Sequence, residues 1–280
     1  MKKHWKQAIY WVVVVALIAV FVYSAYALIT YYMDSRENEE TYENLAQMLV
    51  DRPTISLPQD SDGETVPPET QPEQELVTVQ NPETGEILEI LPEYAPIYSL
   101  NPDLVGWISI DGTKVHYPVV QSSLDNPNYY LDRNFEKKYS SHGCIYASEA
   151  ADVFTPSDNV TLYGHRMADN SMFGELGYYT EKDFWQEHQY IRFDTLQERH
   201  LYQVIYVFST TASLGEGFAY HNFVDAADSS NFNAYIFQCK ELSYYDTGLT
   251  AEYGDKLITL STCEYTNTHG RLVVVAKRIA

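Results

Sequence analysis

The hydrophobic and polar positions divide the chain into three parts. Residues 8–32 carry no charge, and this apolar run is long enough to cross the roughly 30 Å hydrocarbon core of a membrane as a helix. Residues 33–93 are acidic, rich in Pro and Glu, and poor in large apolar side chains. From residue 94 onward, short runs of strand-forming residues alternate with turn residues, which predicts a folded domain over residues 94–280.

Residues 8–32 are predicted to be a membrane anchor. Lysines precede the run and acidic residues follow it, which places residues 1–7 in the cytoplasm and the rest of the chain outside the cell. The alternative is a cleaved signal peptide, because residues 24–27 have small side chains at a spacing typical of cleavage sites. The apolar run continues beyond them, so we favour a retained single-pass anchor.

Residues 33–93 are predicted to form an extracellular stalk. Its first part can form a short amphipathic helix with Leu45, Met48 and Leu49 on one side. The remainder is expected to stay solvated and extended, because it cannot bury enough apolar surface to offset the entropy lost on ordering.

The folded domain is predicted to be mostly β. Turn residues such as the Asp111–Gly112 pair separate most of its candidate strands, and many short strands in one domain indicate a barrel. The eight candidates are residues 105–110, 114–120, 143–148, 159–165, 190–195, 200–211, 256–262 and 271–279. Helices are expected within 93–105, 172–188 and 228–245.

The net charge and the cysteine count exclude some classes of function. The formal net charge of −21 argues against nucleic acid, because phosphate binding requires clustered Lys and Arg. Three cysteines do not suit a disulfide-rich scaffold. Cys144 and Cys239 are expected to fill core space, and a disulfide between them stays open at this stage.

Cys263 and Arg271 lie at the facing ends of two predicted neighbouring strands. If these strands pair antiparallel, the two side chains share one rim of the sheet. A nearby cation favours the thiolate form of a cysteine and supplies directed hydrogen bonds. The alternative is a buried cysteine and a surface arginine without chemistry.

His165 is the histidine best placed to act as a base, because it follows an apolar run and a glycine where a strand would enter a loop. A structural histidine is the alternative. Together, Cys263, His165 and Arg271 fit thiol acyl transfer, with a nucleophile, a proton carrier and an oxyanion stabiliser. No His, Cys or carboxylate cluster has the spacing of metal ligands, so neither a metal nor a cofactor is predicted.

These residues carry a resemblance to a known family. The stretches "TLSTC" and "YGH" followed by "MF" resemble those of the sortases, the membrane-anchored cysteine transpeptidases of Gram-positive surfaces. The resemblance covers residues 94–280 and includes "NPDLVGWISIDGTKVHYPVVQ", "DNPNYYLDRNF" and "TLYGHRMADNSMFGEL" in family order. The long insertion at 213–255, with its predicted helix, resembles the class B branch.

The resemblance implies an eight-stranded sortase-type β-barrel with N-terminal helices and a helix in the insertion before the cysteine strand. By motif position, Cys263 would be the nucleophile, His165 the general acid/base and Arg271 the donor to the scissile carbonyl oxygen. The residues implied to line the peptide groove are Ser261, Glu264, Leu131 and Asn126, with Asn128 as an alternative to Asn126 because the family usually has one residue fewer before the leucine.

The function implied is cleavage of a C-terminal sorting signal through a thioacyl-enzyme intermediate. The protein would then be joined to an amine of a peptidoglycan precursor or of a pilin. Two features depart from the family pattern: the connection from Cys263 to Arg271 is short for class B, and Tyr265 stands where some members carry an aspartate. The alternatives are a membrane-tethered cysteine endopeptidase and a non-catalytic surface module that binds peptides.

Overall fold

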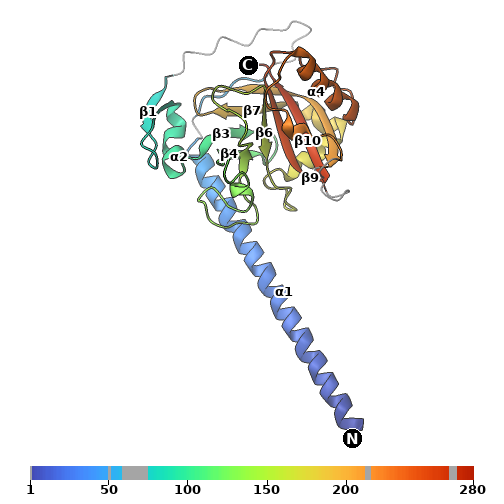
Figure 1. The fold of residues 1–280 in the computed structure, drawn as a ribbon. Helices are drawn as coiled ribbons and strands as arrows, with labels where there is room; N and C mark the ends of the chain where they lie inside the picture. Colours follow the sequence, from blue (N-terminus) through green and yellow to red (C-terminus); the bar gives the residue numbers. More distant parts are fainter. Residues whose placement is uncertain (1, 50–51, 59–74, 212–215, 265–269) are drawn as a thin grey trace. The chain divides into compact units, whose positions relative to one another are not determined.

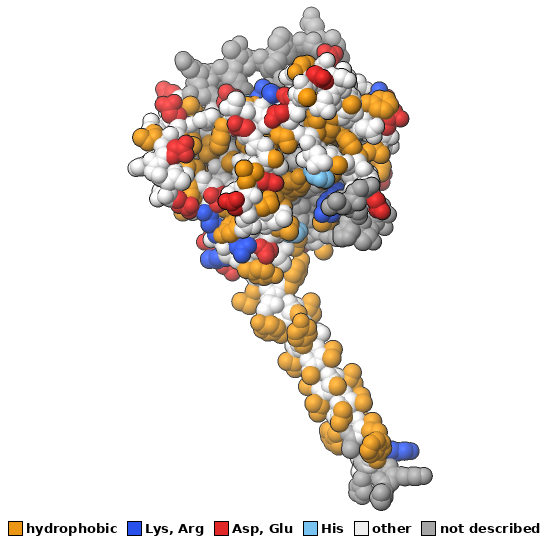
Figure 2. Space-filling view, in the orientation of Figure 1, with side chains coloured by type: hydrophobic (Ala, Val, Ile, Leu, Met, Phe, Trp, Pro, Cys, Tyr) orange, Lys and Arg blue, Asp and Glu red, His pale blue; other side chains and the backbone are white. Residues whose placement is uncertain are grey.

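The structure is a computed structural model that describes residues 2–49, 52–58, 75–211, 216–264 and 270–280. Its residues form two compact units, 1–41 and 42–280. The first unit belongs to one long helix, α1, which extends over Lys2–Gln47. Hydrophobic side chains are displayed along this helix (Figure 2). A part of it is long and apolar enough to cross a membrane, whereas its orientation stays a prediction.

The second unit begins with the last turns of α1. Tyr42, Leu45 and Leu49 are buried in the core of this unit. The prediction of an amphipathic helix is therefore right for Leu45 and Leu49. It is wrong for Met48, whose side chain is 48% exposed.

Part of the predicted stalk is folded. Strands β1 (Val77–Gln80) and β2 (Ile87–Ile90) pair antiparallel, and Ile90 and Leu91 are fully buried. The expectation of a solvated, extended chain is wrong for these residues. The prediction relied on the acidic average composition of residues 33–93, which does not reflect this local run of β-branched and apolar side chains. Residues 59–74 lie outside the described residues.

Among the described residues, eight strands close into a barrel in the order β10-β8-β7-β3-β4-β5-β6-β9 (Figure 1). Every segment predicted as a strand in the folded domain forms one of them, so the mostly β barrel prediction is confirmed. The strands are β3 (Leu104–Ser109), β4 (His116–Gln121), β5 (Ile145–Ala147), β6 (Asn159–Tyr163), β7 (Tyr190–Thr195), β8 (Leu201–Thr211), β9 (Leu257–Glu264) and β10 (Gly270–Arg278).

Helices lie in the three regions predicted for them. The described short helices are η1 (Pro92–Tyr94), α2 (Ala95–Leu100), η2 (Tyr129–Leu131), η3 (Gly174–Thr180), α3 (Lys182–Glu187) and η4 (Tyr220–Asn222). The helix predicted in the long insertion is α4 (Ser229–Leu242), whose N-cap Asp228 accepts a hydrogen bond from the Asn231 N–H group. Such a cap satisfies a donor that the first turn leaves unpaired.

Two hydrophobic clusters lie on opposite faces of the sheet near its cysteine strand. Successive strand residues point to opposite faces. Leu272 and Val274 of β10 join the cluster inside the barrel, whereas Val273 and Val275 join a second cluster with α4. The second cluster includes Phe232, Tyr235 and Cys239 of α4. The face of β9 and β10 under the insertion, called the outer face below, is therefore distinct from the barrel interior.

Candidate active site

Cys263 and Arg271 are direct partners across β9 and β10. Directly opposed residues of an antiparallel pair have Cβ atoms roughly 4.5–5.5 Å apart, so these two side chains are neighbours. The predicted antiparallel pairing of the two strands is confirmed. Cys263 is partly exposed, and the Arg271 Nη1 group donates a hydrogen bond of 3.0 Å to the carbonyl of Gly270.

The alternation of side chains places both residues on the outer face. Arg271 has the same parity along β10 as Val273 and Val275, which pack under α4. Cys263 faces the same way because it opposes Arg271. Thiol and guanidinium therefore lie beside the insertion and outside the barrel interior.

His165 follows the strand on the other side of β9. β6 runs parallel to β9, with Tyr163 opposite Ser261, and the Gly164 N–H group donates to the Ser261 carbonyl over 3.2 Å. His165 comes two residues after Tyr163, just as Cys263 comes two residues after Ser261. The register thus brings the imidazole-bearing residue to the same sheet end as Cys263. Thiol, imidazole and guanidinium are the groups that thiol acyl transfer needs.

Three tyrosines surround this end of the sheet, and the sequence did not single them out. Tyr146 of β5 and Tyr163 of β6 are cross-strand partners whose ring centroids lie 5.4 Å apart. The Tyr220 hydroxyl, from the insertion, lies 2.6 Å from the Ser261 hydroxyl. With 25 tyrosines in the chain, only the position of Tyr163 two residues before His165 offered a signal.

The charge of Arg271 affects the pKa of two of these tyrosines. Burial raises the pKa of Tyr146 to about 12, and the Arg271 guanidinium opposes that rise. Burial also raises the pKa of Tyr220, whereas its hydrogen bond with Ser261 and the charge of Arg271 lower it. Both phenols are therefore neutral near pH 7, and the Arg271 guanidinium is the cation beside them.

The residues implied to line a peptide groove have different surroundings. Ser261 is buried under Tyr220, and the Leu131 side chain is 43% exposed while its carbonyl lies 2.6 Å from His165 Nε2. Asn126 is exposed, and its N–H group donates to the Ser123 carbonyl. The Glu264 side chain lies outside the described residues, as do Tyr265 and the connection to Gly270. Their roles in substrate binding stay predictions.

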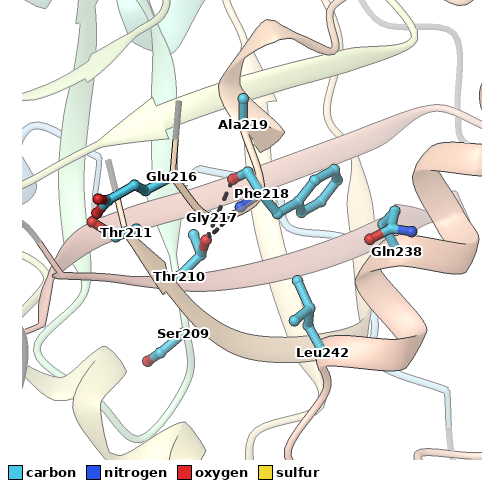
Figure 3. A pocket seen from close by; sticks show the side chains of 9 residues that line it. All are labelled: Ser209, Thr210, Thr211, Glu216, Gly217, Phe218, Ala219, Gln238 and Leu242. Carbon is cyan, nitrogen blue, oxygen red and sulfur yellow. Dashed lines mark hydrogen bonds between the residues drawn. The ribbon is translucent and has the colours of Figure 1, made fainter. Parts of the chain in front are cut away.

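A hollow of about 700 Å³ opens next to this end of the sheet (Figure 3). Thr210 on β8, which opposes Arg271, is one of its lining residues, and Phe218 donates its N–H group to the Thr210 hydroxyl. Glu216, Gln238 and Leu242 also line it. Hydroxyl, amide and carboxylate groups thus border the arginine side of the site.

The other two cysteines are free thiols buried in separate clusters, Cys144 in the barrel interior and Cys239 on the buried face of α4. They form no disulfide in the structure, which settles the question left open by the sequence. Burial raises the pKa of each thiol to about 12, so neither is a thiolate at neutral pH. Within the described part of the chain, no three His, Cys, Asp or Glu side chains are arranged to hold a metal ion.

Comparison with known proteins agrees with this arrangement. The family model described as the sortase domain matches residues 108–279. Sortase B of Staphylococcus aureus (strain NCTC 8325 / PS 47) is 25% identical over 272 residues, 96% of each chain. The structure of sortase B from B. anthracis in complex with AAEK1 has a TM-score of 0.66 and 28% identity, covering 88% of this chain and 98% of that one. The Staphylococcus aureus sortase B-substrate complex has a TM-score of 0.61 and 30% identity, covering 68% and 85%.

The chain belongs to the sortase family, whose members are cysteine transpeptidases. Within that family, the curated and structural relatives named above are class B sortases, as the sequence resemblance predicted. The eight-stranded barrel with an N-terminal helix is the sortase fold.

Proposed function

We propose that this sortase uses Cys263 as its nucleophile, His165 as its general acid and base, and Arg271 as its oxyanion donor. The observation that carries the proposal is the pairing of Cys263 with Arg271 on the outer face, next to the strand that leads into His165. Cys144 and Cys239 are buried, which leaves Cys263 as the one partly exposed thiol of the three.

The reaction would proceed in two acyl transfers. The Cys263 thiolate attacks the carbonyl carbon of the scissile peptide bond, and Arg271 donates hydrogen bonds to the resulting oxyanion. Collapse of this intermediate breaks the C–N bond, and imidazolium His165 gives its proton to the leaving amine. An acceptor amine then attacks the thioester and passes a proton to His165. A new amide forms and the thiolate leaves.

The substrate would be the C-terminal sorting signal of secreted proteins. A staphylococcal relative has been solved with a substrate, which supports binding of a substrate at the equivalent site here. The acceptor would be an amine of a peptidoglycan precursor or of a pilin. Leu131, Ser261, Glu264 and Asn126 (or Asn128) would contact the sorting peptide, and the exposed Leu131 side chain is available for such a contact.

The location that suits this reaction is the outer face of the cell membrane. Helix α1 would anchor the chain once, with residues 1–7 in the cytoplasm and the barrel outside, because lysines precede its apolar run and acidic residues follow it. A membrane-impermeant thiol reagent applied to intact cells would then label Cys263. Absence of labelling in cells, with labelling after lysis, would contradict this orientation.

The decisive experiment is detection of the thioacyl enzyme. The full chain in detergent is incubated with synthetic C-terminal signals encoded in the same genome, and intact mass is measured. We expect an acyl adduct for the wild type and for Cys239→Ala, and none for Cys263→Ala. Normal cleavage by Cys263→Ala would refute the assignment.

The acceptor is tested on the same adduct. Addition of an amine such as triglycine should increase the rate of adduct loss and give an amide product, whereas an endopeptidase would give only the hydrolysed acid at an unchanged rate. A non-catalytic binding module would give no adduct at all.

A further inference from the structure

We infer that the backbone carbonyl of Leu131 holds the neutral His165 ring in one tautomer, with its proton on Nε2, so that Nδ1 is the nitrogen that exchanges protons during the reaction. The inference rests on the proposed role of His165. It assigns a positioning function to the backbone of Leu131, a residue whose side chain the sequence resemblance placed in the peptide groove.

The contact between His165 and Leu131 determines where the proton lies. His165 Nε2 is 2.6 Å from the Leu131 carbonyl oxygen. A carbonyl oxygen can only accept a hydrogen bond, and a neutral imidazole carries its single N–H on one of two nitrogens. Nε2 therefore donates, and Nδ1 carries the lone pair that can take a proton from the thiol or the acceptor amine.

Hydrogen bonds of neighbouring backbone groups hold the Leu131 carbonyl in place. Leu131 ends the short helix η2, and its N–H group donates to the Asn128 carbonyl over 3.0 Å. The preceding Tyr130 is fully buried, and its carbonyl accepts a hydrogen bond of 3.0 Å from the Cys144 N–H group. The peptide unit that leads into the acceptor carbonyl is thus tied to the segment before β5.

Gly143 packs directly against this peptide. Its φ is +59°, and a Cβ atom added there would lie 2.6 Å from the Leu131 oxygen and 2.7 Å from the Tyr130 oxygen. Any side chain at this position must displace the carbonyl that His165 uses. The Gly143 carbonyl in turn accepts a hydrogen bond of 3.0 Å from the hydroxyl of Tyr42 in the last turns of α1.

This arrangement fixes the orientation and the tautomer of the His165 ring before either proton transfer begins. With Nε2 engaged by a fixed acceptor, the neutral ring presents the Nδ1 lone pair, and the imidazolium presents Nδ1–H to the leaving amine. Holding a catalytic group within a fraction of an ångström of its productive position matters, because a misplacement of about 1 Å can cost roughly 100-fold in rate.

The tautomer can be read directly in the wild-type protein. The full chain in detergent micelles is labelled with ¹⁵N-histidine, and two-bond ¹H–¹⁵N correlations are recorded at a pH where the ring is neutral. The His165 signals are identified by their loss in His165→Gln. We expect a protonated Nε2 and an unprotonated Nδ1. A ring protonated on Nδ1 would overturn the inference.

Substitution of Gly143 tests whether the position of the Leu131 carbonyl affects the rate of catalysis. A second glycine of the chain provides a matched control. Gly248 has a similar φ of +75°, but a Cβ atom there would meet nothing within 4 Å. Gly143→Ala and Gly248→Ala therefore share backbone strain and differ in the clash with the Leu131 and Tyr130 carbonyls. We expect kcat for peptide cleavage to fall about 100-fold in Gly143→Ala and to remain near the wild-type value in Gly248→Ala.

Equal kcat values for the two variants would refute the positioning role. If Gly143→Ala does not fold, the tautomer of the wild type decides the question. Failure of this inference is distinguishable from failure of the proposed function, because wild-type enzyme that forms the Cys263 adduct with the other tautomer contradicts only the former.

Discussion

Arg52 and Asp194 form an ion pair inside the second unit, with 3.3 Å between Nη1 and Oδ2 and side chains only 5% and 4% exposed. The guanidinium also donates to the hydroxyls of Tyr94 and Ser109, and Tyr94 donates to Asp194 over 2.8 Å. Burial raises the pKa of Asp194, and the charge of Arg52 acts against that rise. A residue of the predicted stalk therefore neutralises a carboxylate buried in β7.

Removal of this arginine should destabilise the folded domain. Arg52→Met leaves Asp194 buried without its counter-charge, and breaking one side of a buried pair costs about 3–5 kcal/mol. Thermal and denaturant unfolding of the full chain would measure the loss. Arg133→Met is the control, because the Arg133–Asp132 pair is largely exposed and should contribute less than about 1 kcal/mol. Equal losses in the two variants would contradict the role of Arg52.

The barrel was predictable because each of its strands is a short run of β-branched and aromatic residues bounded by turn residues. The pairing of Cys263 with Arg271 was predictable for a local reason, since their strands are consecutive in the chain. The proximity of His165 to Cys263 could be predicted only from the family resemblance, because the parallel pairing of β6 with β9 joins strands almost a hundred residues apart.

Contacts that residues before residue 94 make with the predicted folded domain could not be predicted from the sequence. Arg52 lies in acidic, polar sequence where neither periodicity nor composition marks a buried position, whereas Tyr42 lies one turn before Leu45 on the predicted amphipathic helix. Their partners, Asp194 and Gly143, are as distant as 142 residues in sequence. The contact of Leu131 with His165 uses a backbone atom, which no side-chain pattern encodes.

Arg271→Lys should reduce catalysis while keeping the charge. A lysine supplies a point charge without the planar set of donors that a guanidinium presents to an oxyanion. Loss of an oxyanion donor typically lowers kcat by about 100- to 1,000-fold, which peptide-cleavage assays would measure. Arg278→Lys, at the opposite end of the same strand, should retain wild-type kcat. Similar kcat values for both variants would exclude Arg271 as the oxyanion donor.

Tyr220→Phe should lower the free energy of unfolding by about 1 kcal/mol, because it removes a buried hydrogen bond of 2.6 Å to the Ser261 hydroxyl. Denaturant unfolding would measure the change. Tyr244→Phe removes a hydroxyl contact to Ser209 at an exposed position, so a smaller loss is expected. A larger loss for Tyr244→Phe would show that burial of the Tyr220–Ser261 pair contributes little.

His200 should make stability depend on pH. Its burial, with a smaller contribution from the charge of Arg278, lowers its pKa to about 4, from an ordinary value of about 6.5. Between these values the unfolded chain binds a proton that the folded chain does not, so stability falls as the pH falls through this range.

The slope from one such proton is at most about 1.4 kcal/mol per pH unit. His200→Gln should remove up to that amount from the pH dependence of unfolding between pH 6.5 and 4. Denaturant unfolding at several pH values provides the slopes of the wild type and the variant. If His200→Gln keeps the wild-type slope, folding does not lower the pKa of His200, and the Glu198 carboxylate 3.4 Å from its Nε2 offsets the burial of the ring.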